Sequence, residues 1–117
     1  MINMVKVNLS VGDRINLLNI LPTEGDFSLL RISREASILI GLSDEELKEF
    51  EVVTNNVEGQ ISYTWNQGGN KDIELELGPR AFAMICDILE KKDKEKKLLM
   101  NQYDLYEKFV EADKTKL

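Results

Sequence analysis

Carboxylates are the most abundant side chains in this sequence that could do chemistry, and they crowd into the stretch SDEELKEFE at residues 43–51. Its acidic residues are Asp44, Glu45, Glu46, Glu49 and Glu51. Carboxylate oxygens bind Mg²⁺ and Ca²⁺, but this stretch lacks the ligand spacing and the central glycine of an EF-hand loop. A serine followed three residues later by glutamate is instead typical of a helix start. Because acids in a first turn complement the helix dipole, we predict a short helix with a solvated acidic face rather than a metal site.

Histidine is absent from the chain and cysteine occurs once. The chain therefore cannot build a Ser–His–Asp or Cys–His nucleophile arrangement of its own, nor a Cys/His zinc site. The single cysteine, Cys86, falls beside Ile85 and Leu89 on an expected helical stripe, so we predict that its thiol packs in the interior. We expect no catalytic residue, no cofactor and no metal, and thus a protein that is not an enzyme.

The stretch TWNQGGN at residues 64–70 carries the only tryptophan. Tryptophan is enriched among the residues that dominate protein interfaces. The residues that we expect to contact a partner, here and in the acidic stretch, are Trp65, Asn66, Gln67, Asn70, Asp44, Glu45 and Glu49. The alternative is that Trp65 belongs to the core and that its indole N–H finds a partner at a sheet edge. The glycines do not have the pattern of a phosphate-binding loop.

Hydrophobic periodicity predicts the helices that would position these side chains. Residues 11–21 form an apolar stripe that ends before Pro22, since the residue before a proline avoids the α region. We expect Ser10, with Asp13 three residues on, to cap this helix, and Asp26 to cap the next one. Residues 27–40 form a second stripe through Leu29, Ile32, Ala36 and Leu39, although LLRIS could also be a strand. After the short acidic helix, a proline-initiated helix is expected from Pro79. A last helix follows the charged link KKDKEKK, with Tyr103, Tyr106 and Val110 on one line.

Alternating apolar residues predict the strands. MVKVNLSV alternates at the start of the chain, and QISYTWN and KDIELEL alternate between residues 60 and 77. Before them, EVVTN is also β-rich and leads to a predicted turn at NNVEG. We expect QISYTWN and KDIELEL to form one β-hairpin across the Gly-Gly turn of QGGN, since glycine accepts positive φ without steric cost. The predicted fold is a single α+β domain over residues 1–117. Its mostly antiparallel sheet of three to four strands would carry four to five helices on one face.

Charge and hydropathy narrow the class of protein. The net charge is −6, and residues 1–79 carry 13 acidic and 6 basic residues. An acidic surface does not attract phosphates, so we do not expect a nucleic-acid partner. No apolar run approaches the roughly 20 residues that span a bilayer, and MINMVKVNLS lacks the pattern of a signal peptide. With one cysteine and no disulfide, we expect a cytoplasmic protein that does not associate with a membrane.

The sequence resembles small proteins of unknown function encoded by tailed bacteriophages. The resemblance rests on INLLNILPTEGDFSLLRISRE, LSDEELKEFEV, TWN and LYEKFVEAD, and it spans most of the chain. It implies expression in the cytoplasm of an infected bacterium. It implies no activity and no site residues.

Three hypotheses about function follow. The first is a non-enzymatic interaction protein that binds a host or phage macromolecule through a basic surface of the partner, in host takeover or anti-defence. The second is a component that self-associates as a homodimer through Tyr103, Tyr106 and Phe109. The third is a binder of a small molecule such as a nucleotide signal, which would need basic side chains to converge. The arginines available for such a site are Arg14, Arg31, Arg34 and Arg80.

Overall fold

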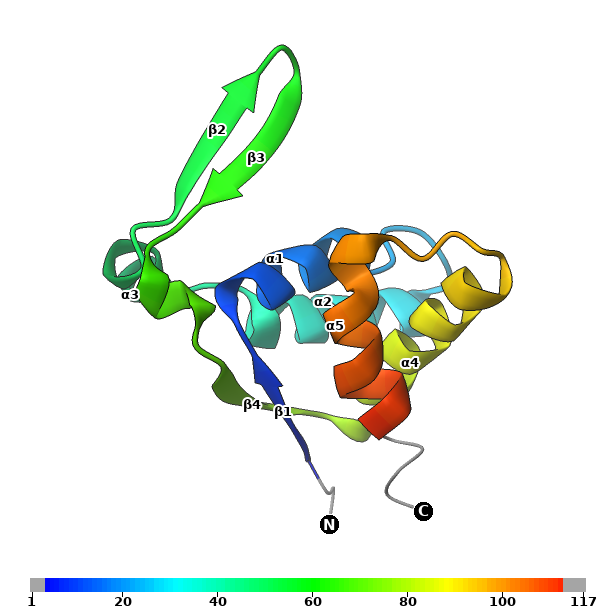
Figure 1. The fold of residues 1–117 in the computed structure, drawn as a ribbon. Helices are drawn as coiled ribbons and strands as arrows, with labels where there is room; N and C mark the ends of the chain where they lie inside the picture. The colour runs from blue at the N-terminus through cyan, green and yellow to red at the C-terminus, as the bar shows by residue number, and fades with distance from the viewer. Residues whose placement is uncertain (1–3, 113–117) are drawn as a thin grey trace.

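The computed structural model describes residues 4–112 and has an α+β fold (Figure 1). Its strands pair into two separate antiparallel two-stranded sheets, β1 with β4 and β2 with β3. The elements in chain order are β1 (Val5–Leu9), α1 (Val11–Ile20), α2 (Phe27–Ile40), α3 (Asp44–Glu49), β2 (Val53–Val57), β3 (Gln60–Thr64), the 3₁₀ turn η1 (Gln67–Asn70), β4 (Ile73–Leu77), α4 (Pro79–Lys94), the 3₁₀ turn η2 (Met100–Gln102), α5 (Tyr103–Tyr106) and the wider π-helical turn η3 (Glu107–Glu111).

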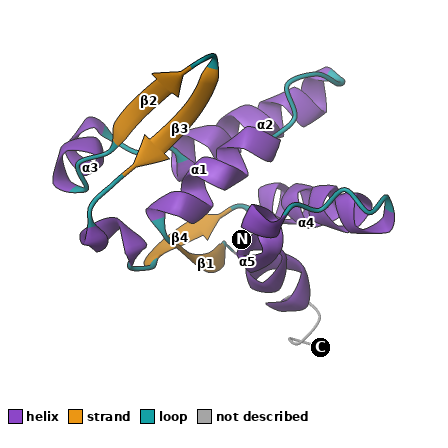
Figure 2. Ribbon diagram, turned by 45° about the horizontal axis from the view of Figure 1, so that its top comes forward, coloured by secondary structure: helices purple, strands orange, loops and turns teal. Residues whose placement is uncertain are grey.

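The β1–β4 sheet packs against one side of the helical body (Figure 2). Its register places Val7 opposite Leu75 and Leu9 opposite Ile73. Successive side chains of a strand point to opposite faces, so these apolar pairs share one face with Val5 and Leu77. That face contacts helices α1 and α2 and the turn η3. The opposite face is polar and exposed. One face of this small sheet is therefore covered by helices, as the alternation in the sequence predicts.

Local capping signals start the helices where the sequence predicts. Ser10 accepts a hydrogen bond from the backbone N–H of Asp13, whose carboxylate accepts one from the backbone N–H of Ser10. Asp26 caps α2 through the N–H of Leu29, and Pro79 is the first residue of α4. Each cap satisfies backbone donors that a helix start leaves without an internal partner.

The core lies between the β1–β4 sheet and helices α1, α2, α4 and α5. Its members are apolar side chains from every one of these elements. Those that are fully buried are Leu9, Leu17, Ala36, Ile40, Leu77, Ile85, Leu89, Leu105 and Phe109. The rings of Phe82 and Phe109 lie 5.3 Å apart between centroids, which joins α4 to the C-terminal helical segment. Cys86 is also buried, as predicted.

The single sheet of three to four strands is wrong, because the expected hairpin does not form. The segment QGGN is a 3₁₀ turn and not a tight hairpin loop. Positive φ occurs instead at Glu58, at 52°, and at Gly59, at 81°. These two residues form the loop between β2 and β3, so β3 pairs with β2 and not with β4. β4 pairs instead with β1, which is far away in the sequence.

The buried stripes of two helices are rotated from those predicted. In α2 the side chains of Ser33, Ala36 and Ile40 are buried, while Leu39 is 45% exposed. In the C-terminal segment Phe109 is buried and Tyr103 is 58% exposed. The π-helical turn has more residues per turn than an α-helix, so a 3.6-residue line drawn through this segment does not hold. Phe109 therefore cannot belong to an exposed dimer surface, and Tyr106 is only half-exposed.

The charged link is also shorter than expected. Helix α4 continues through the first part of KKDKEKK to Lys94, and Lys96 then turns the chain with a φ of 59°. Within residues 4–112, every helix is too short or too polar to traverse a lipid bilayer.

We predict that Phe109→Ala lowers the free energy of unfolding by about 3–5 kcal/mol, since it removes a fully buried ring and leaves a cavity. Tyr103→Ala, in the same segment, should change it by less than about 0.5 kcal/mol because its side chain lies at the surface. Urea unfolding of both variants measures the difference. Equal losses would contradict this assignment of the buried side of the segment.

Candidate functional site

The β2–β3 hairpin projects away from the helical body (Figure 1). We call residues 53–64 the arm. Its residues are exposed, apart from a half-buried Asn55. Positive φ at both loop residues is characteristic of the two-residue turn whose twist matches that of a hairpin. An isolated two-stranded hairpin is only marginally stable in water, so the arm contributes little to the stability of the body.

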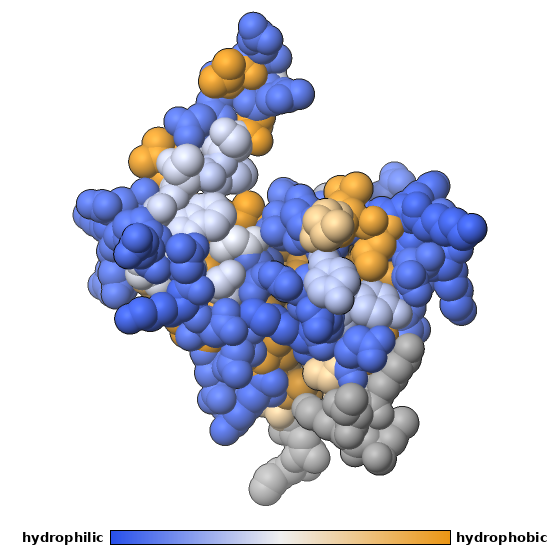
Figure 3. Space-filling model, viewed as in Figure 1, coloured by the Kyte–Doolittle hydropathy of each residue, from blue (hydrophilic) through white to orange (hydrophobic). Residues whose placement is uncertain are grey.

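The apolar side chains of the arm are divided between its two faces. Cross-strand partners share a face, and Thr54 lies opposite Tyr63 while Asn56 lies opposite Ile61. Tyr63 and Ile61 are 38% and 62% exposed. On the other face, Val53 and Val57 are 52% and 67% exposed. Each face of the arm therefore carries two exposed apolar side chains, and Figure 3 shows apolar patches among hydrophilic residues on the arm.

Charged residues are almost absent from the arm. Between Val53 and Thr64 the only ionisable acid or base is Glu58, at the loop, apart from the phenol of Tyr63. Sheet edges of soluble proteins usually carry lysine, proline or bulges that block pairing with another chain. Neither β2 nor β3 contains a lysine or a proline. Both outer edges of the arm lack a strand partner among the described residues.

Trp65 anchors the arm to the body. A methyl group on Gly69 would come within 2.6 Å of its Cδ1 atom, and one on Gly12 within 3.1 Å of its Cζ2 atom. Both glycines therefore allow the indole to approach the backbone closely. The indole N–H donates to Oδ1 of Asn70 over 2.9 Å. Trp65 is half-buried at the junction of arm and body, so the interpretation of Trp65 as a packed residue with a bonded indole N–H fits its position.

Asn66 brings the two predicted groups of contact residues together. Its side-chain amide donates to the carbonyl of Glu49 over 2.9 Å, and its backbone N–H donates to the carbonyl of Phe50 over 2.8 Å. The Oδ1 atom of Asn66 is buried and has no hydrogen-bond partner among the described residues. Helix α3 and the turn η1 thus lie side by side. We call these two elements, with Trp65 and Asn66, the arm base.

The acidic side chains of α3 point to solvent. Asp44, Glu45 and Glu49 are exposed and have no ion-pair partner in the described part of the chain. Gln67 is exposed in η1. The structure thus brings together two groups of residues that the sequence predicted separately. The sequence also predicted a turn at NNVEG, but it did not indicate the exposed apolar residues of the arm as contact residues.

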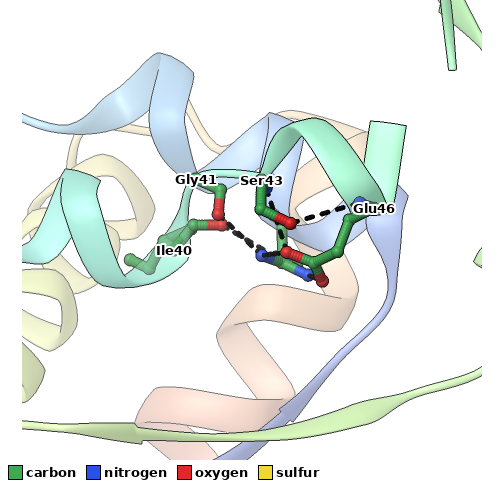
Figure 4. Close-up of polar contacts among 5 residues, drawn as sticks. Ile40, Gly41, Ser43 and Glu46 are labelled. Atoms are coloured by element: carbon green, nitrogen blue, oxygen red, sulfur yellow. Dashed lines mark hydrogen bonds and ion pairs between the residues drawn. The ribbon is translucent and has the colours of Figure 1, made fainter. Parts of the chain in front are cut away.

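A buried arginine holds the arm base on the body (Figure 4). Arg14 is 2% exposed. Its Nε and Nη2 atoms donate to the carbonyl groups of Ile40 and Gly41, each over 2.7 Å. Its Nη1 and Nη2 atoms donate to the carboxylate of Glu46 over 2.6 and 3.1 Å. The contact with Glu46 is a bidentate guanidinium–carboxylate ion pair. Together with the two carbonyl contacts, it joins α1 to the end of α2 and to α3.

Glu46 has two roles in this contact. It accepts hydrogen bonds from Arg14 and also from the backbone N–H of Ser43, which completes the capping box of α3. The hydrogen bond from Arg14 is the main cause that lowers the pKa of Glu46 to about 2, and the bonds to Ser43 act in the same direction against burial. The sequence predicted the capping box, but not the arginine.

A second ionic contact joins the C-terminal segment to α1 and to the residue that precedes β4. The ammonium group of Lys108 lies 2.5 Å from Oδ2 of Asp13 and 3.1 Å from Oδ1 of Asp72. Burial alone would lower the pKa of Lys108, but its bonds to Asp13 and Asp72 raise it above the ordinary value. Asp13 also caps α1, so this contact is structural.

The arginines required for a small-molecule site have different surroundings. Arg14 is fully engaged in the contact described above. The guanidinium carbon of Arg31 lies 4.9 Å from the ring centroid of Phe27. Arg34 lines a hollow of about 280 Å³ between α1 and α2, whose other lining residues include no arginine. Arg80 is exposed near the start of α4. A ligand site would have to form without Arg14.

Within residues 4–112 no group of three or more histidine, cysteine, aspartate or glutamate side chains could hold a metal ion. Comparison of the sequence with protein-family models and with curated proteins, and of the fold with solved structures, gave no match.

We predict that Glu46→Gln lowers the free energy of unfolding at pH 7 by about 1.5–3 kcal/mol, since a buried guanidinium loses its charged acceptor. A lowered pKa stabilises the fold above the unfolded value of 4.5, and this contribution is lost as the pH falls through about 2. The difference between wild type and Glu46→Gln should therefore shrink between pH 4.5 and pH 2 in urea unfolding.

Glu45→Gln is the matched control, because Glu45 lies in the same helical turn and is exposed without an ion pair. Its effect should stay below about 0.5 kcal/mol at every pH. A gap between wild type and Glu46→Gln that persists unchanged at pH 2 would contradict the assigned ion pair.

Proposed function

We propose that this protein is a non-enzymatic interaction protein that binds a protein partner through the arm and the arm base. The observation that carries the proposal is the arm itself. Its residues make two open sheet edges and expose four apolar side chains, Val53, Val57, Ile61 and Tyr63, without covering any part of the core. A hairpin that adds little to folding and keeps apolar surface in water is consistent with a surface used for binding.

The charge of the arm base supports a basic partner. Asp44, Glu45 and Glu49 are exposed on α3, and Glu51 follows in the connection to β2. Figure 3 shows the hydrophilic surface around α3 below the arm. Acids that lie together without ion-pair partners attract a positively charged protein and speed its approach. The overall charge of −6 acts in the same sense.

The partner would be found in an infected bacterium if the resemblance to phage proteins holds. The resemblance rests on four stretches of the sequence and supports a search among host and phage proteins. Host takeover and anti-defence are the roles that such an interaction protein would serve. A cytoplasmic site of action belongs to the same proposal.

Affinity capture tests this function. We predict that a variant carrying Val53→Lys and Val57→Lys recovers at least one protein from an extract of phage-infected bacteria about tenfold less well than wild type, as measured by quantitative mass spectrometry. Interface residues whose truncation matters cost more than about 1 kcal/mol, and two lysines in the arm also repel a basic partner.

The matched control carries Ile38→Lys and Leu39→Lys. These residues of α2 are 71% and 45% exposed, so the control makes the same change in charge at apolar surface outside the arm. It should recover the partner as wild type does. Equal recovery by the arm variant and the control, or no protein recovered above an unrelated bait, would contradict the proposed function.

A second candidate function is self-association in an assembly. The residues before and within the start of α5 expose a compact apolar patch, visible in Figure 3, whose members Leu99, Met100 and Tyr103 are 55%, 87% and 58% exposed. This patch shares Tyr103 with the predicted dimer surface, but it lacks the half-buried Tyr106 and the buried Phe109. A symmetric dimer is the commonest assembly of such surfaces.

Sedimentation velocity tests the second candidate. A dimer at micromolar concentration that Met100→Glu converts to a monomer would support it, since the substitution places a charge on the most exposed residue of the patch. A wild-type monomer of 13.4 kDa at this concentration would contradict it.

A further inference from the structure

We infer that the partner adds an extended segment as a third strand along the free edge of β2, and that this segment carries lysine or arginine where it reaches α3. The inference rests on the proposed function and specifies how binding occurs. It requires three properties of the arm: an open hydrogen-bonding edge, side chains that tolerate a neighbouring strand, and charge at one end.

The backbone of β2 has free donors and acceptors at its outer edge. Residues opposite each other in an antiparallel pair alternate between hydrogen-bonded and non-bonded pairs. Val57 and Gln60 flank the two-residue loop, where the turn closes with a hydrogen bond between its first and last residues. The alternation then directs the N–H and C=O groups of Thr54 and Asn56 away from β3. Both residues are exposed, so a strand could pair there.

The side chains of β2 fit a neighbouring strand. The strand VTNNV has no charge, no proline and no glycine. Val53 and Val57 lie on one face and expose apolar surface that a β-branched residue of an added strand would cover. Three strands form an independently stable sheet more readily than two. Pairing would therefore stabilise the arm and cover its apolar surface at once.

The position of α3 favours the β2 edge over the β3 edge. Both ribbon views place β2 on the side of α3 and β3 on the side of α1 (Figures 1 and 2). β2 begins four residues after the end of α3, so a strand along its edge ends next to the exposed acids of α3. These carboxylates have no ion pairs among the described residues. A cationic end on the added segment complements them.

A second copy of this chain fits the same edge less well. An antiparallel pair of identical β2 strands would place the loop residue Glu58 of one copy beside the acids of α3 of the other. Like charges so placed oppose pairing, and each copy has a net charge of −6. A basic segment of another protein meets no such repulsion.

Binding of synthetic peptides to the full chain tests the inference. The probe is KKTVTVTVKK, whose lysines reach α3 whichever way the peptide runs. The comparison peptide EETVTVTVEE has glutamate in place of lysine. We expect the lysine peptide to bind at least about tenfold more tightly at low salt, and the ratio to fall at 0.5 M salt, since screening weakens interactions between exposed charges. Equal affinities at low salt would overturn the role of the acids.

Backbone pairing has its own controls. A lysine peptide N-methylated at every amide of its TVTVTV segment cannot donate a ladder hydrogen bond from either edge and should not bind detectably. On the protein, Asn56→Pro removes an outward N–H of β2, whereas Ile61→Pro makes the equivalent change on the outer edge of β3. Asn56→Pro should abolish peptide binding and Ile61→Pro should retain it. Binding by the N-methylated peptide, or loss by Ile61→Pro with retention by Asn56→Pro, would overturn strand addition at β2.

Amide hydrogen exchange gives a readout that does not depend on a variant folding. The lysine peptide should slow exchange at Thr54 and Asn56 and leave Ile61 and Tyr63 unchanged. A concentration-dependent dimer of the free chain that protects the same two amides would overturn the inference in favour of a second copy. The lysine peptide could fail to bind while the Val53→Lys, Val57→Lys variant still recovers less of a partner than wild type does. That result would exclude strand addition and leave the proposed function standing.

Discussion

The buried guanidinium of Arg14 is the contact on which the relation between arm and body depends. It donates to two carbonyl groups at the end of α2 and to the carboxylate of Glu46 in α3. A buried cation without these acceptors would cost several kcal/mol. Because Glu46 also completes the cap of α3, one carboxylate fixes both the start of this helix and its position on α1. The side-chain amide of Asn66 donates to the carbonyl of Glu49 in α3, so the position of α3 also fixes the residues at the base of the arm.

The body and the arm are stabilised by different interactions. In the body, the sheet β1–β4 and four helices bury a contiguous apolar core, and the ion pair between Lys108 and Asp13 joins the C-terminal segment to α1. The arm has no core of its own, and its strands pair only with each other. Local units with few buried contacts open more readily than the rest of a fold. The arm is therefore the part of the molecule that a partner can stabilise most.

The sequence predicted the elements better than their pairing. The caps at Ser10, Asp26 and Ser43 depend on residues three apart, and each is formed as predicted. The alternation in β1 and β4 also gave the correct buried face of each strand. It did not give their partners, because the same alternation suits any neighbour. Two glycines in QGGN suggested a hairpin loop, but Gly69 is needed for the close approach of Trp65.

Composition and short-range spacing by themselves determined the α+β class, the helix starts, the packing of Cys86 and the residue types at the arm base, since each of these depends on neighbours in the chain. Only the tertiary structure decided that β4 pairs with β1, that Arg14 reaches Glu46 across 32 residues, and that the arm stands clear of the core. These features arise from contacts between distant segments. Their energies depend on burial and geometry that no local pattern records, and the arm is exposed because the helices cover a different sheet.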